Sequence, residues 1–177
     1  MKKIYCVIFL MLLAAQTAYA DRNDGAYAYL QGDYETAYNT MISLANTSDD
    51  KIAQYYLGVM YMKGQGVEQD YKEASEWFRK ASEQGLAVAM YKLADLYTMG
   101  EGVPKDLEFA YIWYSVGAVH NHEKSINILG EAKSRLTSEE LVSANQLVAE
   151  YVEKYGPKEE EEEEGKTIGS DPTASKN

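Results

Sequence analysis

The chain has 177 residues, of which 28 are acidic and 17 are lysine or arginine, giving a formal net charge of −11 at pH 7. Such an acidic balance excludes nucleic acid as an expected partner, because phosphate binding needs a basic surface. The length suits one ordinary domain. The single cysteine, Cys6, cannot form a disulfide within the chain, so packing alone must stabilise the fold.

Residues 1–20 have the pattern of a cleaved secretory signal peptide. Lys2 and Lys3 give a positive start, residues 4–13 are an unbroken apolar run, and Ala18-Tyr19-Ala20 is a small-residue cleavage site. The run is too short to span a bilayer, which takes about 20 apolar residues. We expect export, with the periplasm as the destination and full secretion as a further option. The mature chain would then begin at Asp21, contain no cysteine and have no stable membrane insertion, whereas an uncleaved anchor is the alternative.

A repeat with an offset of 36 residues dominates the middle of the chain, where residues 53–81 recur at 89–117. A period of 20 to 50 residues with helical spacing inside it indicates a stacked array of helices, each unit burying its apolar face against its neighbours. The positions that define the first copy are Leu57, Gly58, Tyr61, Gly64, Gly66, Asp70, Ala74 and Trp77. Their counterparts in the second copy are Leu93, Tyr97, Gly100, Gly102, Asp106, Ala110 and Trp113.

Each copy reads as two helices joined by a glycine loop. In the first copy, apolar and small residues at spacings of three and four predict an amphipathic helix over 51–63. The glycines of the loop allow positive φ angles between the helices. Asp70 stands at the N-cap position of the second helix, and Gly85 ends that helix.

The repeat extends in both directions. Leu129-Gly130 matches Leu57-Gly58 and predicts a further first helix over 123–136, followed by a capping box at residues 137–140 and a last helix. Residues 32–37 resemble the start of a second helix and predict a shorter first unit. The expected domain covers 21–156, with units at about 24–46, 50–85, 86–121 and 122–156. The six glutamates at 159–164 predict that 157–177 is a flexible, disordered acidic tail.

The pattern Ala-x-x-x-Leu-Gly-x-x-Tyr-x-x-Gly-x-Gly-Val-x-x-Asp-x-x-x-Ala-x-x-Trp-x-x-x-Ala, read from Ala53 to Ala81, resembles the Sel-one-like repeat, a relative of the tetratricopeptide repeat. The resemblance implies an all-α fold, a short α-solenoid in which about four antiparallel helix pairs form a right-handed superhelix. It also implies an adaptor or scaffold, as in many exported bacterial members. One secreted branch has cysteine pairs in each repeat and is linked to penicillin binding or β-lactam hydrolysis, and this chain departs from it.

The residues that could carry chemistry are few. His120 and His122 flank Asn121 at a predicted turn, and a polar turn is a better interpretation than a zinc site, since adjacent loop residues rarely hold metal geometry. Trp77 and Trp113 share one phase of the repeat, which favours the core over a ligand platform. The glycine loops lack the Lys-Ser/Thr of a phosphate loop. We therefore expect no catalytic residue, no metal and no cofactor.

The positions left for a partner lie on the first helices, which line the concave face of such arrays. Their positions around the first helices indicate that eight residues do not point into the contacts between packed helices, which we call seams. These residues are Ile52, Tyr55, Val59, Met62, Val88, Tyr91, Asp95 and Thr98. Tyr55 and Tyr91 offer large amphipathic contact area, although both could simply pack against the adjoining helix. The leading hypothesis is an exported adaptor that binds a protein or peptide in a concave groove. The alternatives are a cell-envelope binder or enzyme acting on peptidoglycan or a β-lactam, and a host-directed effector or envelope structural protein.

Overall fold

The computed structural model describes residues 21–158, within which all regular structure is helical. A helical segment at 21–31 is followed by α2 (Tyr34–Thr47), α3 (Lys51–Lys63), α4 (Tyr71–Glu83), α5 (Ala87–Met99), α6 (Leu107–Val119), α7 (Glu123–Ser134) and α8 (Ser138–Tyr155). The predicted signal peptide at 1–20 and residues 159–177 of the predicted tail lie outside the described residues. Over 21–158, no helix is both long enough and apolar enough for a membrane crossing.

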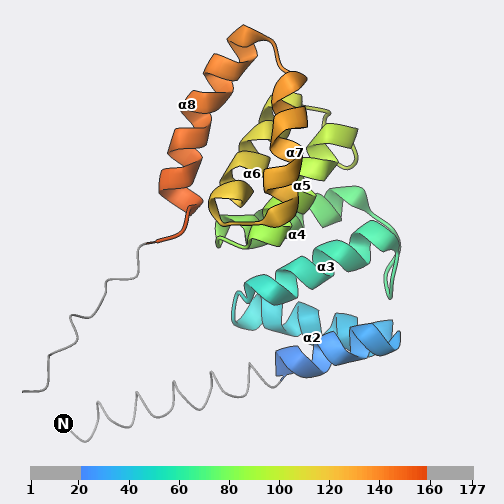
Figure 1. Ribbon diagram of the computed structural model, residues 1–177. Helices are drawn as coiled ribbons and strands as arrows, with labels where there is room; N and C mark the ends of the chain where they lie inside the picture. Colours follow the sequence, from blue (N-terminus) through green and yellow to red (C-terminus); the bar gives the residue numbers. More distant parts are fainter. Residues whose placement is uncertain (1–20, 159–177) are drawn as a thin grey trace, which may run out of the picture.

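The helices stack in chain order, so that each one from α2 to α6 packs against the next (Figure 1). The main core runs through α3 to α8 and contains fully buried residues of α4, α5 and α6. A smaller core joins α2, α3 and α4. The predicted all-α solenoid of helix pairs is therefore confirmed.

The glycine loops have the backbone conformation that the sequence predicted. Gly64 and Gly100 end α3 and α5 in the left-handed region, with φ of 67° and 78°. Gly66 has φ of 76°, and a Cβ atom there would lie 2.6 Å from the carbonyl oxygen of Tyr34. These glycines are thus structural, because a side chain would clash with the preceding unit and strain the turn.

The aspartates after the loops begin the second helices. Asp70 accepts the backbone N–H groups of Lys72 and Glu73 at 2.8 and 3.1 Å, and Asp106 accepts that of Phe109 at 2.9 Å. A helix leaves its first backbone N–H groups without internal partners, so these side chains fix where α4 and α6 start. Both predicted N-caps are confirmed.

Trp77 and Trp113 lie in the core, as their shared repeat phase predicted. Trp77 is 8% exposed and Trp113 is 3% exposed. Trp113 stacks on Tyr155 with ring centroids 5.7 Å apart and meets Tyr151 edge to face at 5.2 Å. The two tryptophans therefore hold neighbouring helices together and leave no open ring face for a ligand.

The fourth unit differs from the others, although both of its helices form and the capping box of Thr137 and Glu140 is present. α8 packs against α6, and α6 lies between α8 and α7, which have little contact with each other (Figure 1). The repeat register gives the reason. Counted from the N-caps Asp106 and Thr137, Ala144 and Asn145 stand in α8 where α6 has Trp113 and Tyr114, so α8 lacks the aromatic pair of a second helix.

Candidate functional site

A pocket of about 330 Å³ opens between α5, α6 and α7. It is lined by Asp95, Thr98 and Met99 from α5, by Leu107, Ala110 and Tyr114 from α6, and by Ile128, Glu131, Ala132 and Arg135 from α7 and its C-cap. Two first helices form its walls and a second helix forms its floor. Asp95 and Thr98, two of the eight predicted partner residues, line it.

The pocket exists because the repeat changes its residues at this seam. Leu96 is fully buried in the core, and the residue 36 positions later is Ala132, which lines the pocket. Replacing a leucine by an alanine at a packed position leaves the volume of the missing carbon atoms unfilled. The seam between units two and three is thus closed, and the seam between units three and four is open.

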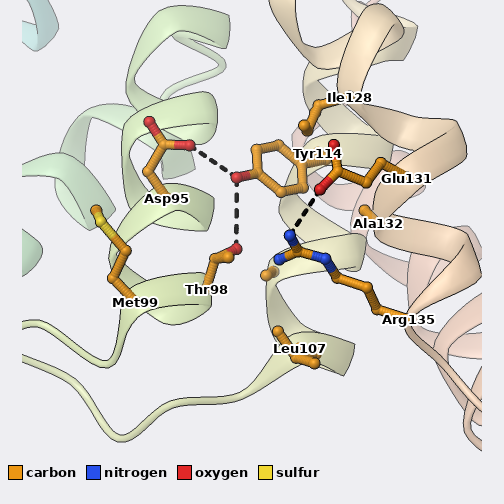
Figure 2. A pocket seen from close by; sticks show the side chains of 10 residues that line it. Asp95, Thr98, Met99, Leu107, Tyr114, Ile128, Glu131, Ala132 and Arg135 are labelled. Atoms are coloured by element: carbon orange, nitrogen blue, oxygen red, sulfur yellow. Dashed lines mark hydrogen bonds and ion pairs between the residues drawn. The ribbon is translucent and has the colours of Figure 1, made fainter.

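Two further changes make the open seam polar. Asp95 stands where the preceding unit has Val59, and Tyr114 stands where it has Phe78. The Tyr114 hydroxyl donates to Asp95 Oδ1 at 2.7 Å and lies 3.4 Å from Thr98 Oγ1 (Figure 2). The pocket wall therefore presents a fixed carboxylate and phenol instead of two apolar side chains.

The charge of Asp95 is set by burial and by its partners. Burial raises the pKa of this carboxyl group, and the hydrogen bond from Tyr114 and the charges of Lys92 and Lys124 oppose that rise. Lys92 Nζ lies 3.8 Å from Asp95 Oδ2. Burial also raises the pKa of Tyr114, so the phenol stays protonated as a hydrogen-bond donor.

The opposite rim carries an ion pair on the last turn of α7. Arg135 Nη2 lies 2.6 Å from Glu131 Oε1, and both side chains are exposed (Figure 2). An exposed pair of this kind is held by less than about 1 kcal/mol. Arg135 can therefore exchange its carboxylate for one on a ligand at small cost.

Tyr55 and Tyr91 are half-buried and pack on aromatic neighbours. The ring of Tyr55 lies 5.9 Å from those of both Tyr56 and Phe78. The ring of Tyr91 lies 5.6 Å from that of Tyr114 and 5.3 Å from that of His122. Burial raises the pKa of both phenols. Their packing role is therefore visible, and a binding role for their exposed edges stays a prediction.

The structure separates the other predicted partner residues. Asp95 and Thr98 come together in the pocket. Ile52, Met62 and Val88 are half-buried on α3 and α5, away from it. Val59 is only 7% exposed and belongs to the main core, so it offers a partner almost no surface. Helical phase alone did not reveal that the next unit covers this position.

The sequence interpretation missed the residues that α6 and α7 bring to the pocket, notably Tyr114, Ile128 and Arg135. A signal was available in the comparison of repeat copies. Polar or small residues replace large apolar ones at Asp95, Tyr114 and Ala132, and all three replacements fall at one seam. Departures from a repeat mark a possible site better than the repeated residues do.

The two histidines serve the turn before α7. His120 Nε2 lies 2.7 Å from the carbonyl oxygen of Tyr155, which ties the turn to the end of α8. His122 is the N-cap of α7, and its Nδ1 accepts the backbone N–H of Ser125 at 3.3 Å. Within 21–158, no three His, Cys, Asp or Glu side chains gather as metal ligands would. The polar-turn interpretation accounts for both side chains.

Helix pairs that stack in chain order define the α-solenoid class of repeat proteins. The family model of the Sel1 repeat matches residues 51–86 and 87–118, which are the pairs α3–α4 and α5–α6. The chain thus contains two Sel1 repeats. Proteins of this family commonly act as scaffolds for protein–protein interaction.

Solved structures agree with this assignment. A protective antigen of uropathogenic Escherichia coli that displays an SLR fold is 30% identical, with a TM-score of 0.74 over 79% of this chain and 31% of that chain. A Sel1 repeat protein from Oxalobacter formigenes is 29% identical, with a TM-score of 0.59 over 73% of this chain and 55% of that one. The chain thus spans about a third and about half of these relatives. No curated protein matches the sequence.

Proposed function

We propose that this protein is an exported, periplasmic adaptor that binds a segment of another protein along its first helices and carries out no catalysis itself. The observation that supports the proposal is the pocket between α5, α6 and α7, which opens where the repeat stops filling its own seam and which is lined by two of the predicted partner residues, Asp95 and Thr98. Its apolar floor and few fixed polar groups are typical of a binding site.

Site-specific crosslinking tests the groove. A photoreactive amino acid replaces Met62 or Met99 on the first helices, or Glu76, which is exposed on α4, as the control. The protein is expressed in its native cells and irradiated. We expect one partner to be captured from Met99 most strongly, from Met62 as well, and from Glu76 only at background. Equal capture from Glu76 would contradict binding in the groove.

A pocket-filling variant tests the pocket itself. Ala132→Leu places a leucine in the pocket, at the position equivalent to Leu96 in the closed seam. The larger side chain should fill the pocket and reduce capture of the same partner at least about tenfold without unfolding the chain. Ser143→Leu, at an exposed residue of α8, is the matched control. If both variants capture the partner as the native protein does, the pocket is not the binding site.

Export rests on the sequence pattern of residues 1–20. The similar E. coli protein is a protective antigen, and an exported location for this chain agrees with that. Fractionation of native cells, followed by mass measurement of the intact protein, should place it in the periplasm with Asp21 at its N-terminus. A cytoplasmic protein that still contains residues 1–20 would refute this part of the proposal.

A further inference from the structure

α7 has a second face, on the side opposite the pocket, that no helix of residues 21–158 covers. It consists of Ile126, Leu129, Gly130 and Lys133, which follow one another at helical spacings. The pocket-lining residues of α7, such as Ile128 and Ala132, point the other way by helical phase. The face is therefore separate from the groove of the proposed function.

The residues at the equivalent positions of α5, 36 residues earlier, are buried. Met90, Leu93 and Ala94 are fully buried and Tyr97 is 8% exposed, because α6 packs on that helix. On α7, Ile126 is 50% exposed. Gly130 and Lys133 are exposed and Leu129 is half-buried. The face thus has the composition of a helix seam without the helix that would cover it.

The glycine shows the vacancy most directly. A Cβ atom on Gly58, the equivalent residue of α3, would lie 2.6 Å from the ring of Phe78 on α4. A Cβ atom on Gly130 would have no neighbour within 4 Å. A small residue at this phase admits an aromatic ring from the covering helix, and in the fourth unit no ring occupies the space.

Lys133 adds information about the first turn of the absent helix. In the second unit, the backbone N–H of Asp70, the N-cap of α4, donates to the carbonyl oxygen of Tyr61 at 3.0 Å. The third unit repeats this contact between Asp106 and Tyr97 at 3.0 Å. Lys133 is the next residue in that series. A covering helix would therefore bring its N-cap to a lysine, where a carboxylate is favoured.

We propose that the uncovered face of α7 binds an amphipathic helix of a partner protein, packed as α4 packs on α3, with an aromatic side chain over Gly130 and an N-cap carboxylate beside Lys133. Helices bind such grooves through apolar side chains at spacings of three and four. The array then continues into the partner, and α8 stays on α6. This surface is independent of the pocket, so the two can bind different segments.

The probe is a fluorescently labelled peptide with the sequence of residues 69–85, which supplies Asp70 and Phe78 in the required register. Fluorescence anisotropy with the full chain should show saturable binding below about 1 mM, the weak end of the affinity scale. Gly130→Val on the protein and Phe78→Ala on the peptide should each reduce affinity at least about tenfold. Val142→Glu, at an apolar residue of α8 that is 62% exposed, is the control and should leave affinity unchanged.

Charge exchange tests the orientation. Lys133→Glu should weaken the native peptide several-fold, and a peptide with Lys at the Asp70 position should recover that loss. Absence of binding, equal binding by Gly130→Val, or no recovery by the exchanged peptide would overturn the proposal. So would a dimer of the chain that Ile126→Glu dissociates, because the face would then be covered by a second copy. Circular dichroism and urea midpoints confirm that each variant is folded.

Discussion

The third and fourth units each begin with a first helix, and only one of these two helices is buried. α5 buries six residues, whereas α7 buries Ser125 and Ala132. The difference arises because α6 covers α5 and α8 does not cover α7. A first helix in this array is therefore buried by the helix that follows it. In the fourth unit α8 packs on α6 instead, so part of the surface of α7 stays exposed.

The two seams on either side of α5 show the same contrast inside the array. Val59, Phe78 and Leu96 fill the first, and Asp95, Tyr114 and Ala132 leave a pocket in the second. Over one repeat period three residues change, and a packed seam becomes a pocket. The following predictions test this difference between closed and open regions.

The largest effect is expected from opening the closed seam. Leu96→Ala should lower the free energy of unfolding by about 2 to 5 kcal/mol, because Leu96 is fully buried and its removal leaves a cavity. Urea denaturation followed by circular dichroism measures the loss. Leu129→Ala, the same change on half-buried α7, should cost clearly less. Equal losses would contradict the view that α7 is loosely covered.

Alanine at two equivalent glycines should have opposite effects. Gly58→Ala should destabilise by roughly 1 to 3 kcal/mol, because its Cβ would lie 2.6 Å from Phe78. Gly130→Ala should stabilise by up to about 1 kcal/mol, since alanine favours the helix and its Cβ meets no neighbour. Thermal unfolding of both variants compares them directly. A shift of the same sign in both would show that α7 is covered after all.

The contributions of Asp95 and Tyr114 to stability should depend on each other. Tyr114→Phe should cost about 1 to 2 kcal/mol, because Asp95 loses its hydroxyl donor while remaining half-buried. The double variant Asp95→Val with Tyr114→Phe copies the closed seam and should recover much of that loss. Urea midpoints for the two variants measure the coupling. Additive losses would indicate that the two side chains do not depend on each other.

The smallest effect is a pH dependence at the start of α7. Nδ1 of His122 accepts the backbone N–H of Ser125, so the cap requires a neutral imidazole. The pKa of His122 is lowered, chiefly by burial and then by the charge of Lys124, while Asp95 and Glu123 act in the opposite direction. The unfolded chain therefore binds the proton more tightly than the folded chain, and stability falls as the pH decreases.

This cap should contribute fully above about pH 6.5, the ordinary pKa of histidine, and be lost as the pH falls through the lower pKa of the folded state. The loss should be about 1 kcal/mol or less, the usual value of a helix cap. His122→Asn caps the helix without titrating, so its unfolding free energy should change less between pH 7 and 5. An unchanged slope in this variant would assign the pH dependence to other groups.

Much of the fold was predictable because it repeats. Gly64, Asp70 and Trp77 return 36 residues later, and a feature that appears twice at helical spacing has a local cause in turn geometry, capping or burial. The burial of Val59 could not be predicted from its position around its helix, because that burial depends on α5, which belongs to another unit. The pocket could not be located from the sequence alone. Its three substituted residues, Asp95, Tyr114 and Ala132, lie on three different helices and come together only in the folded structure.

The sequence by itself determined where the helices of the central repeats begin and end and which residues cap them or form their turns, because those properties depend on contacts within one period. It also determined that the units stack in order, because each repeated unit buries its apolar face against its neighbours. Only the tertiary structure decided that α8 packs on α6, that Asp95 meets Tyr114, and that one face of α7 stays open. Those outcomes depend on which helices become neighbours in space. Because α8 lacks the repeat pattern, its sequence does not predict which helix it packs against.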